Sequence, residues 1–73
     1  MNGTSEHAPA EVIPAALDGE RLDRIVALLA GVSRNRAAAA IDEGRISVNG
    51  VACTQRAYRV TTGERLEIAD LSR

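Results

Sequence analysis

The feature that most constrains this fold is a change of hydrophobic period at Gly44, inside the stretch SRNRAAAAIDEGRISVNG (residues 33–50). Before Gly44, four consecutive alanines that follow the N-cap residue Ser33 predict a helix over residues 34–43. After Gly44, apolar residues alternate with polar ones, as in a strand. The next pair, Asn49-Gly50, predicts a tight hairpin. The stretch therefore predicts a helix, a strand and a turn in immediate succession.

The flanking sequence predicts a second helix and further short strands. Apolar residues at i, i+3, i+4 and i+7 predict a helix over residues 20–30, which Gly31 ends. Strands are expected at residues 10–13, 46–48, 51–53 and 65–69, and an irregular segment at residues 54–58. The order strand, helix, helix, strand, strand, strand predicts a small α+β domain with two packed helices on one side of a short sheet.

Length limits the chain to one domain. At 73 residues it can bury only about 60% of the surface that its unfolded chain exposes. The first residues are small and polar without periodicity, so we expect residues 1–10 to be a disordered leader. The domain itself is placed at residues 11–69, and residues 70–73 are expected to be a tail or the start of a linker.

The single cysteine and the absence of a long apolar run indicate a cytoplasmic protein. Cys53 is the single cysteine, so no internal disulfide can form, which fits a reducing compartment. No apolar run approaches the roughly 20 residues of a membrane span, and no basic region precedes an apolar one at the N-terminus. We therefore expect a monomer in the cytoplasm, with no membrane segment, no metal and no cofactor.

The net charge of −1 conceals an uneven distribution. Residues 1–20 carry four acidic and no basic side chains, whereas residues 21–60 carry seven arginines and three acidic side chains. Every basic residue is arginine, whose planar guanidinium suits phosphate oxygens. The middle of the chain is therefore the part suited to an anionic partner.

Two of these arginines open the helix predicted at residues 34–43. The free N–H groups and the positive end of the helix dipole attract anions at this point. Arg34 and Arg36 add charge at the same end, where the dipole disfavours cations, so their presence indicates an anionic partner. Alternatively, Asp23 or Glu20 could pair with one of them across the contact between the helices.

A set of residues with characteristic spacings runs through residues 11–69. They are Gly19, Arg21, Leu22, Asp23, Ser33, Arg34, Ile41, Gly44, Arg45, Ile46, Val48, Asn49, Gly50, Val60, Gly63, Glu64 and Ile68. Together they resemble the S4 RNA-binding domain, in particular the one at the N-terminus of RluA-type ribosomal large-subunit pseudouridine synthases. The resemblance implies an S4-like (alpha-L) fold, in which two packed helices and a small bent antiparallel or mixed sheet present a groove for structured RNA.

The resemblance also implies that the start of the second helix and the segment around the hairpin face the RNA. Arg45, Arg56 and Arg59 could then line one groove with the helix start, and Arg21 would extend it, although any of them could be a solvated surface charge. Asn49 must first serve the turn. The candidate RNA contacts are therefore Arg34, Arg36, Ser33, Arg45, Arg56, Arg21, Asn49 and Arg59.

Two other residues require separate interpretation. Arg-Leu-Asp at residues 21–23 resembles the catalytic motif of these synthases, but it opens a helix and is not followed by a Thr-Ser-Gly run. We expect Asp23 to orient an arginine and not to catalyse. Tyr58 is the single aromatic residue, either a stacking platform for a base or a core or rim side chain. One aromatic residue favours recognition of RNA shape and phosphates over stacked single strands.

The leading hypothesis is a noncatalytic S4 module that positions structured ribosomal RNA. In this hypothesis it is the N-terminal domain of a 23S ribosomal RNA pseudouridine synthase, whose catalytic domain would follow residue 73. A second hypothesis is a free-standing, ribosome-associated S4 protein. A third, from another class, is a protein-docking module that uses the acidic leader and the alanine-rich helix; the net charge of −1 favours it.

Overall fold

A computed structural model describes residues 10–69 of the chain. The predicted tail at residues 70–73 lies outside these residues, as does the predicted leader apart from Ala10. The elements are β1 (Ala10–Val12), a short 3₁₀ helix η2 (Ala15–Leu17), α1 (Leu22–Ala30), α2 (Arg34–Asp42), β2 (Ile46–Val48), β3 (Val51–Ala52) and β4 (Arg65–Ile68). Their order confirms the predicted α+β class, with two helices followed by most of a small sheet.

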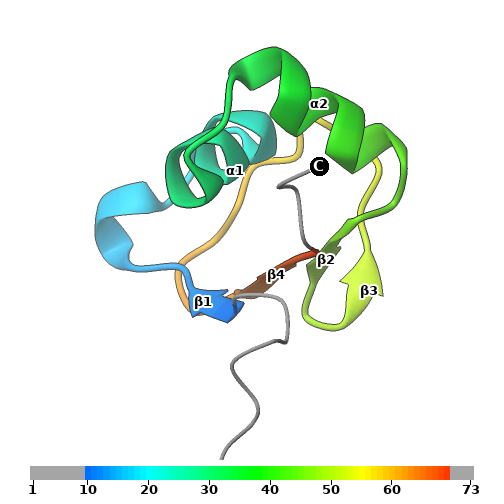
Figure 1. Ribbon diagram of the computed structural model, residues 1–73. Coiled ribbons are helices and arrows are strands. Elements are labelled where there is room, and N and C mark those ends of the chain that lie inside the picture. The colour runs from blue at the N-terminus through cyan, green and yellow to red at the C-terminus, as the bar shows by residue number, and fades with distance from the viewer. Residues whose placement is uncertain (1–9, 70–73) are drawn as a thin grey trace, which may run out of the picture.

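The four strands form one antiparallel sheet in the order β1-β4-β2-β3. The last strand, β4, therefore lies between the first strand and the hairpin. Its Glu67 pairs with Ala10 of β1 on one side and with Ser47 of β2 on the other. Figure 1 shows the two helices together on one side of this sheet, as the sequence predicts.

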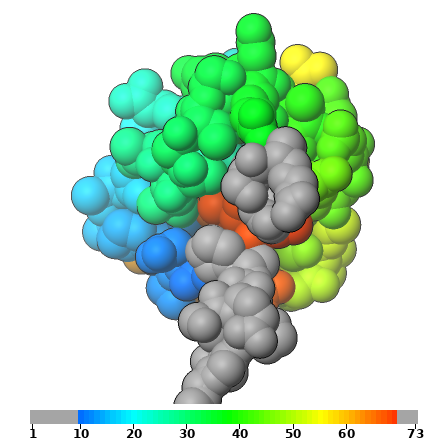
Figure 2. Space-filling view, in the orientation of Figure 1, coloured from blue at the N-terminus to red at the C-terminus, as the bar shows by residue number. Residues whose placement is uncertain are grey.

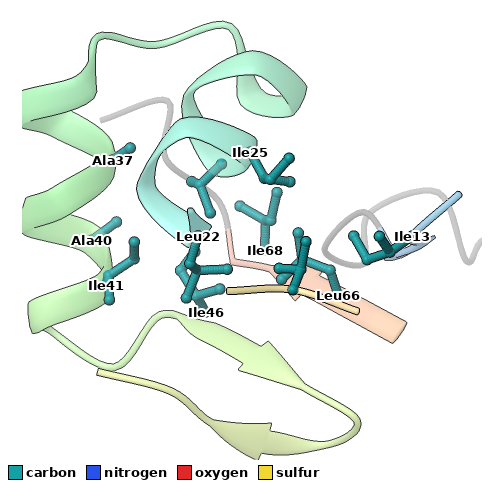
Figure 3. Close-up of a cluster of buried hydrophobic side chains, with 11 residues drawn as sticks. Ile13, Leu22, Ile25, Ala37, Ala40, Ile41, Ile46, Leu66 and Ile68 are labelled. Carbon is teal, nitrogen blue, oxygen red and sulfur yellow. The ribbon is translucent and has the colours of Figure 1, made fainter. Parts of the chain in front are cut away.

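The hydrophobic core fills the space between the helices and the sheet (Figure 3). Alternation turns Leu66 and Ile68 of β4 inward, where they are almost completely buried. Small side chains of α2, Ala37 and Ala40, face α1 and are also buried, which confirms that the alanine-rich helix packs closely. The core residues are Ile13, Leu22, Ile25, Val26, Ala37, Ala40, Ile41, Ile46, Val60, Leu66 and Ile68.

Both ends of α2 are closed as the sequence predicts. The Ser33 hydroxyl accepts a hydrogen bond from the N–H of Arg36 (3.1 Å), which satisfies one of the free donors of the first turn. At the other end, Gly44 adopts a left-handed conformation with φ +79°. The N–H of Gly44 donates to Ile41 and that of Arg45 to Ala40, a Schellman arrangement that turns the chain into β2.

The predicted hairpin is also present. Asn49 (φ +54°) and Gly50 (φ +84°) both have positive φ, as a type I′ turn requires. Asn49 is held further by β4, because its Oδ1 accepts a hydrogen bond from the N–H of Arg65 (2.9 Å) and its own N–H donates to the carbonyl of Arg65 (2.7 Å). The turn residue therefore connects the hairpin to the central strand.

The largest difference from the predicted boundaries is at α1, which begins at Leu22, two residues later than expected. The elements β1, α2, β3 and β4 each end one residue earlier than expected. Arg21 is extended and forms an isolated antiparallel bridge with Arg59. The N–H of Leu22 donates to the carbonyl of Tyr58 (2.7 Å). Figure 1 shows the segment between β3 and β4 passing behind α1 on its way back to the sheet. Pairing with this segment holds the chain extended up to Arg21 and so delays the helix.

Candidate nucleic-acid interface

Asp23 in the first turn of α1 is the centre of the arginine arrangement. It is only 5% exposed, although it is charged. Arg21 binds both of its carboxylate oxygens, through Nε to Oδ1 (3.3 Å) and through Nη2 to Oδ2 (3.1 Å). Arg34, the first residue of α2, donates from Nη2 to Oδ1 (3.2 Å). One carboxylate therefore joins the start of both helices, which is the alternative that the sequence left open for Arg34.

The charge state of Asp23 follows from these contacts. Burial favours the neutral carboxyl group, but the hydrogen bonds and charge of Arg21 and the charge of Arg34 outweigh it. Together they hold the pKa of Asp23 below its ordinary value. Asp23 is therefore ionised at neutral pH, and the group of two guanidiniums and one carboxylate carries a net positive charge.

Arg56 and Arg59 approach the same helix end from the segment between β3 and β4. The carbonyl of Arg56 accepts a hydrogen bond from the N–H of Asp23 (3.2 Å), and Arg59 is the bridge partner of Arg21. The Arg56 side chain forms a bidentate ion pair with Asp42 of α2, with distances of 3.3 and 2.9 Å. In Figure 2 this segment, in yellow, emerges at the edge of the molecule beside the green α2.

Arg59 is held by a backbone contact, and no carboxylate among residues 10–69 pairs with it. Its Nη1 donates to the carbonyl oxygen of Gly19 (2.9 Å), and its side chain is exposed. Four of the predicted arginines thus surround the start of α1, and we refer to Arg21, Arg34, Arg56 and Arg59 as the arginine cluster. Side-chain exposures of 44%, 51% and 54% for Arg21, Arg34 and Arg56 leave part of each guanidinium open to a ligand.

Ser33 and Arg36 lie beside the cluster, at the start of α2. The hydroxyl of Ser33 is occupied by the N–H of Arg36, so its first role is to cap the helix. The Arg36 side chain is exposed. The first turn of α2 therefore presents Arg34 and Arg36 at the end of the helix where the dipole is positive.

Two predicted site residues lie elsewhere. Arg45 follows the C-terminal end of α2, roughly 15 Å along the helix from Arg34, where it pairs with Glu43 (2.9 Å) and its carbonyl accepts from Ala69. Asn49 lies at the tip of the hairpin, which Figure 1 shows at the end of the hairpin remote from α2. Arg45 therefore lies three residues beyond Asp42, the ion-pair partner of Arg56, and Asn49 lies in the turn of the hairpin.

Tyr58 is a rim residue with a structural contact. Its ring is half-buried against the core, and its hydroxyl donates to Glu64, which also accepts the N–H of Thr61 (2.7 Å). The hydrogen bond to Glu64, and then burial, raise the pKa of Tyr58 above its ordinary value. The ring also lines a shallow hollow beside β3, together with Val51, Cys53 and Gln55.

The arrangement favours binding of phosphates over catalysis. Guanidiniums offer several donors to phosphate oxygens, and four of them are gathered from three separate segments of the chain. Among residues 10–69 there is no group of three or more His, Cys, Asp or Glu residues that could hold a metal ion. Within the same residues, no helix is long and apolar enough to cross a bilayer.

Sequence reasoning missed the part played by the backbone at residues 56–60. Its carbonyls accept the first N–H groups of α1, where the side chain of the N-cap residue Arg21 makes no capping hydrogen bond, and this contact brings Arg56 and Arg59 to the helix start. The only signals in the sequence are the arginines themselves and the buried Val60, which anchors the segment in the core.

The chain matches the model of a known domain family. The family model for the S4 domain matches residues 20–66, from just before α1 into β4, which is more than half of the chain. All eight predicted RNA contacts fall inside the matched range. No curated protein matches the chain.

Proposed function

The chain belongs to the S4 domain family, whose domain is an RNA-binding module, and from this premise we propose that its arginine cluster binds the phosphates of structured RNA. The observation that carries the proposal is the half-exposed Arg21 and Arg34 fixed on one buried carboxylate. Rigid guanidiniums at the junction of two helices suit a fixed spacing of phosphates, which folded RNA provides. Stacking is a minor contribution, because Tyr58 is the only aromatic side chain.

The direct test is a titration of the labelled 73-residue chain with folded fragments of large-subunit ribosomal RNA. Amide shifts are expected at residues 33–36 and around residues 21 and 56. Affinity should fall steeply with added salt, since each phosphate contact releases counterions. Equal affinity at low and moderate salt would contradict the proposal.

Arg34→Ala and Arg65→Ala form a matched pair for this test. Each side chain is at least half exposed and pairs with an acidic residue, but Arg65 belongs to β4, where its backbone pairs with Val12 and Asn49. We expect Arg34→Ala to weaken RNA binding by on the order of tenfold, the effect of one charge-assisted hydrogen bond. Arg65→Ala should change it by less than about twofold, and Arg34→Ala/Arg36→Ala should lower the salt slope further.

For the parent protein, we propose a cytoplasmic pseudouridine synthase acting on 23S ribosomal RNA, with this domain at its N-terminus. The support is the set of matching residues, among them Gly19, Ser33 and the Arg45-Ile46 pair, in the spacing typical of those synthases. In that protein the S4 domain holds the RNA and a separate catalytic domain isomerises uridine without a cofactor. The reading frame after Arg73 tests this: a catalytic Arg-Leu-Asp motif followed by Thr-Ser-Gly is expected there.

Two other results of these experiments would favour the alternative functions. A stop codon directly after Arg73, together with RNA binding, would favour the free-standing ribosome-associated protein. Absence of any RNA-induced shift at residues 33–36 would favour the protein-docking module, which would use the alanine-rich helix α2 as a surface.

A further inference from the structure

Asp23 differs from every other acidic residue in the described part of the chain. Within residues 10–69 it is the only charged side chain that is buried. A buried carboxylate is costly unless charged donors surround it, and here three guanidinium hydrogen bonds from two arginines meet that need. The two arginines come from different segments, one before α1 and one at the start of α2.

Shared contact with a buried group also restricts the arginines. The fork of Arg21 is fixed by two bonds to Asp23, and Arg34 is tied to the same oxygen, Oδ1. Both long side chains would otherwise lose rotamer freedom only when a ligand binds. Holding them in advance removes that cost from the binding step.

We propose that Asp23 is a positioning residue for RNA binding: it fixes Arg21 and Arg34 as one pair that receives a backbone phosphate. This inference rests on the proposed function and adds that a negative charge inside the interface strengthens binding of a polyanion. Removal of the Asp23 carboxylate therefore weakens RNA binding, although the loss of one negative charge would by itself be expected to strengthen it.

Asp42 supplies the contrast that makes the inference testable. It forms a bidentate ion pair with Arg56, but its side chain is 48% exposed, compared with 8% for Asp23. An exposed carboxylate on an interface arginine is replaced by an incoming phosphate with little cost. Asp42 thus competes with RNA for Arg56, whereas Asp23 orients Arg21 and Arg34.

The experiment compares Asp23→Asn with Asp42→Asn in the full 73-residue chain. Both changes remove one negative charge and keep the side-chain shape. With a folded large-subunit ribosomal RNA fragment at fixed salt, we expect Asp23→Asn to bind on the order of tenfold more weakly, the effect of one charge-assisted hydrogen bond. Asp42→Asn should bind equally or about twofold more tightly. Tighter binding by both variants would overturn the inference.

A readout without RNA separates the two proposals. In the native chain the NMR signals of the groups that donate to Asp23, Nε–Hε of Arg21 and Nη–Hη of Arg34, should be resolved, and in Asp23→Asn they should approach those of free arginine. If these signals behave so but the native chain binds no RNA, the proposed function fails and the arginine positioning stands. If the native chain binds RNA and Asp23→Asn binds equally well, only the inference fails.

Lysine variants cover the case in which Asp23→Asn does not fold, as judged by circular dichroism. Arg21→Lys and Arg34→Lys keep the charge but lose the planar fork. A several-fold loss of RNA affinity in both, with Arg65→Lys unchanged, supports the positioning role. Affinity equal to that of the native chain in both would overturn it.

Discussion

The N–H of Leu22 donates a hydrogen bond of 2.7 Å to the carbonyl oxygen of Tyr58, residues 36 positions apart, and this contact fixes the start of α1. The side chain of Arg21, the N-cap residue, makes no capping hydrogen bond. The segment that provides the carbonyl also carries Arg56 and Arg59, so the same backbone contact that begins the helix gathers the arginine cluster.

The titration of Tyr58 tests the contact that holds this segment to the turn before β4. Because Tyr58 is the only tyrosine, the ultraviolet absorbance of tyrosinate reports its pKa directly. We expect a pKa above the ordinary value of about 10, since the hydroxyl donates to Glu64. Glu64→Gln should lower that pKa, whereas Glu67→Gln should leave it unchanged. An unshifted native pKa would contradict the contact.

The raised pKa of Tyr58 also makes the stability of the domain depend on alkaline pH. The folded pKa of Tyr58 is raised, so the stability it contributes is complete below the unfolded pKa of about 10 and is lost as pH rises through the folded pKa. Tyr58→Phe should therefore show a smaller fall in the free energy of unfolding over that alkaline range, measured by urea denaturation.

The local elements could be predicted from the sequence because their signals are local. Ser33, Gly44 and the Asn49-Gly50 pair each specify a backbone conformation within a few residues, and all three lie where they were expected. The position of Arg45 could not be predicted. Whether an arginine joins a groove depends on how α2 packs against the segment at residues 56–60, and no local pattern encodes that packing, in which Arg56 binds Asp42.

The arginine contacts show the same limit. The sequence left two partners open for Arg34, the RNA or an acidic residue of the first helix. The structure pairs it with Asp23, while Glu20 pairs with Arg24 on the surface of α1. Choosing between these carboxylates requires the burial of Asp23, which only the packed fold provides.

Close packing of the helices predicts different effects at neighbouring alanines. Ala40 is 4% exposed and faces α1, whereas Ala39 is exposed. We expect Ala40→Leu to destabilise the domain by about 1–3 kcal/mol, because the added methylenes force the helices apart. Ala39→Leu should change the free energy of unfolding by less than about 0.5 kcal/mol. Thermal and urea unfolding of both variants measure the difference, and equal effects would argue against the close contact.

The stability of the domain should depend on both the side chain and the backbone conformation of the turn residue Asn49. Alanine at this position would lose the Oδ1 acceptor of the Arg65 N–H and would have to adopt a positive φ. We expect Asn49→Ala to lower stability by about 1–3 kcal/mol. Asn49→Gly keeps the permitted φ and loses only the hydrogen bond, so its cost should be smaller. A glycine variant less stable than the alanine variant would be inconsistent with a type I′ turn.

Acid stability provides a further test of Asp23. Its folded pKa is lowered, so the stability it contributes is complete above the unfolded pKa of about 3.9 and is lost as pH falls through the folded pKa. Asp23→Asn should be less stable than the native chain by about 1–2 kcal/mol at neutral pH, and this difference should shrink below about pH 4.

Asp18, whose pKa is also lowered, by hydrogen bonds from Thr62, changes the acid stability of the native and Asp23→Asn chains equally. Asp42→Asn is the control, because its ion pair is exposed. A difference between native and Asp23→Asn chains that is independent of pH would mean that Asp23 acts through packing and not through its charge.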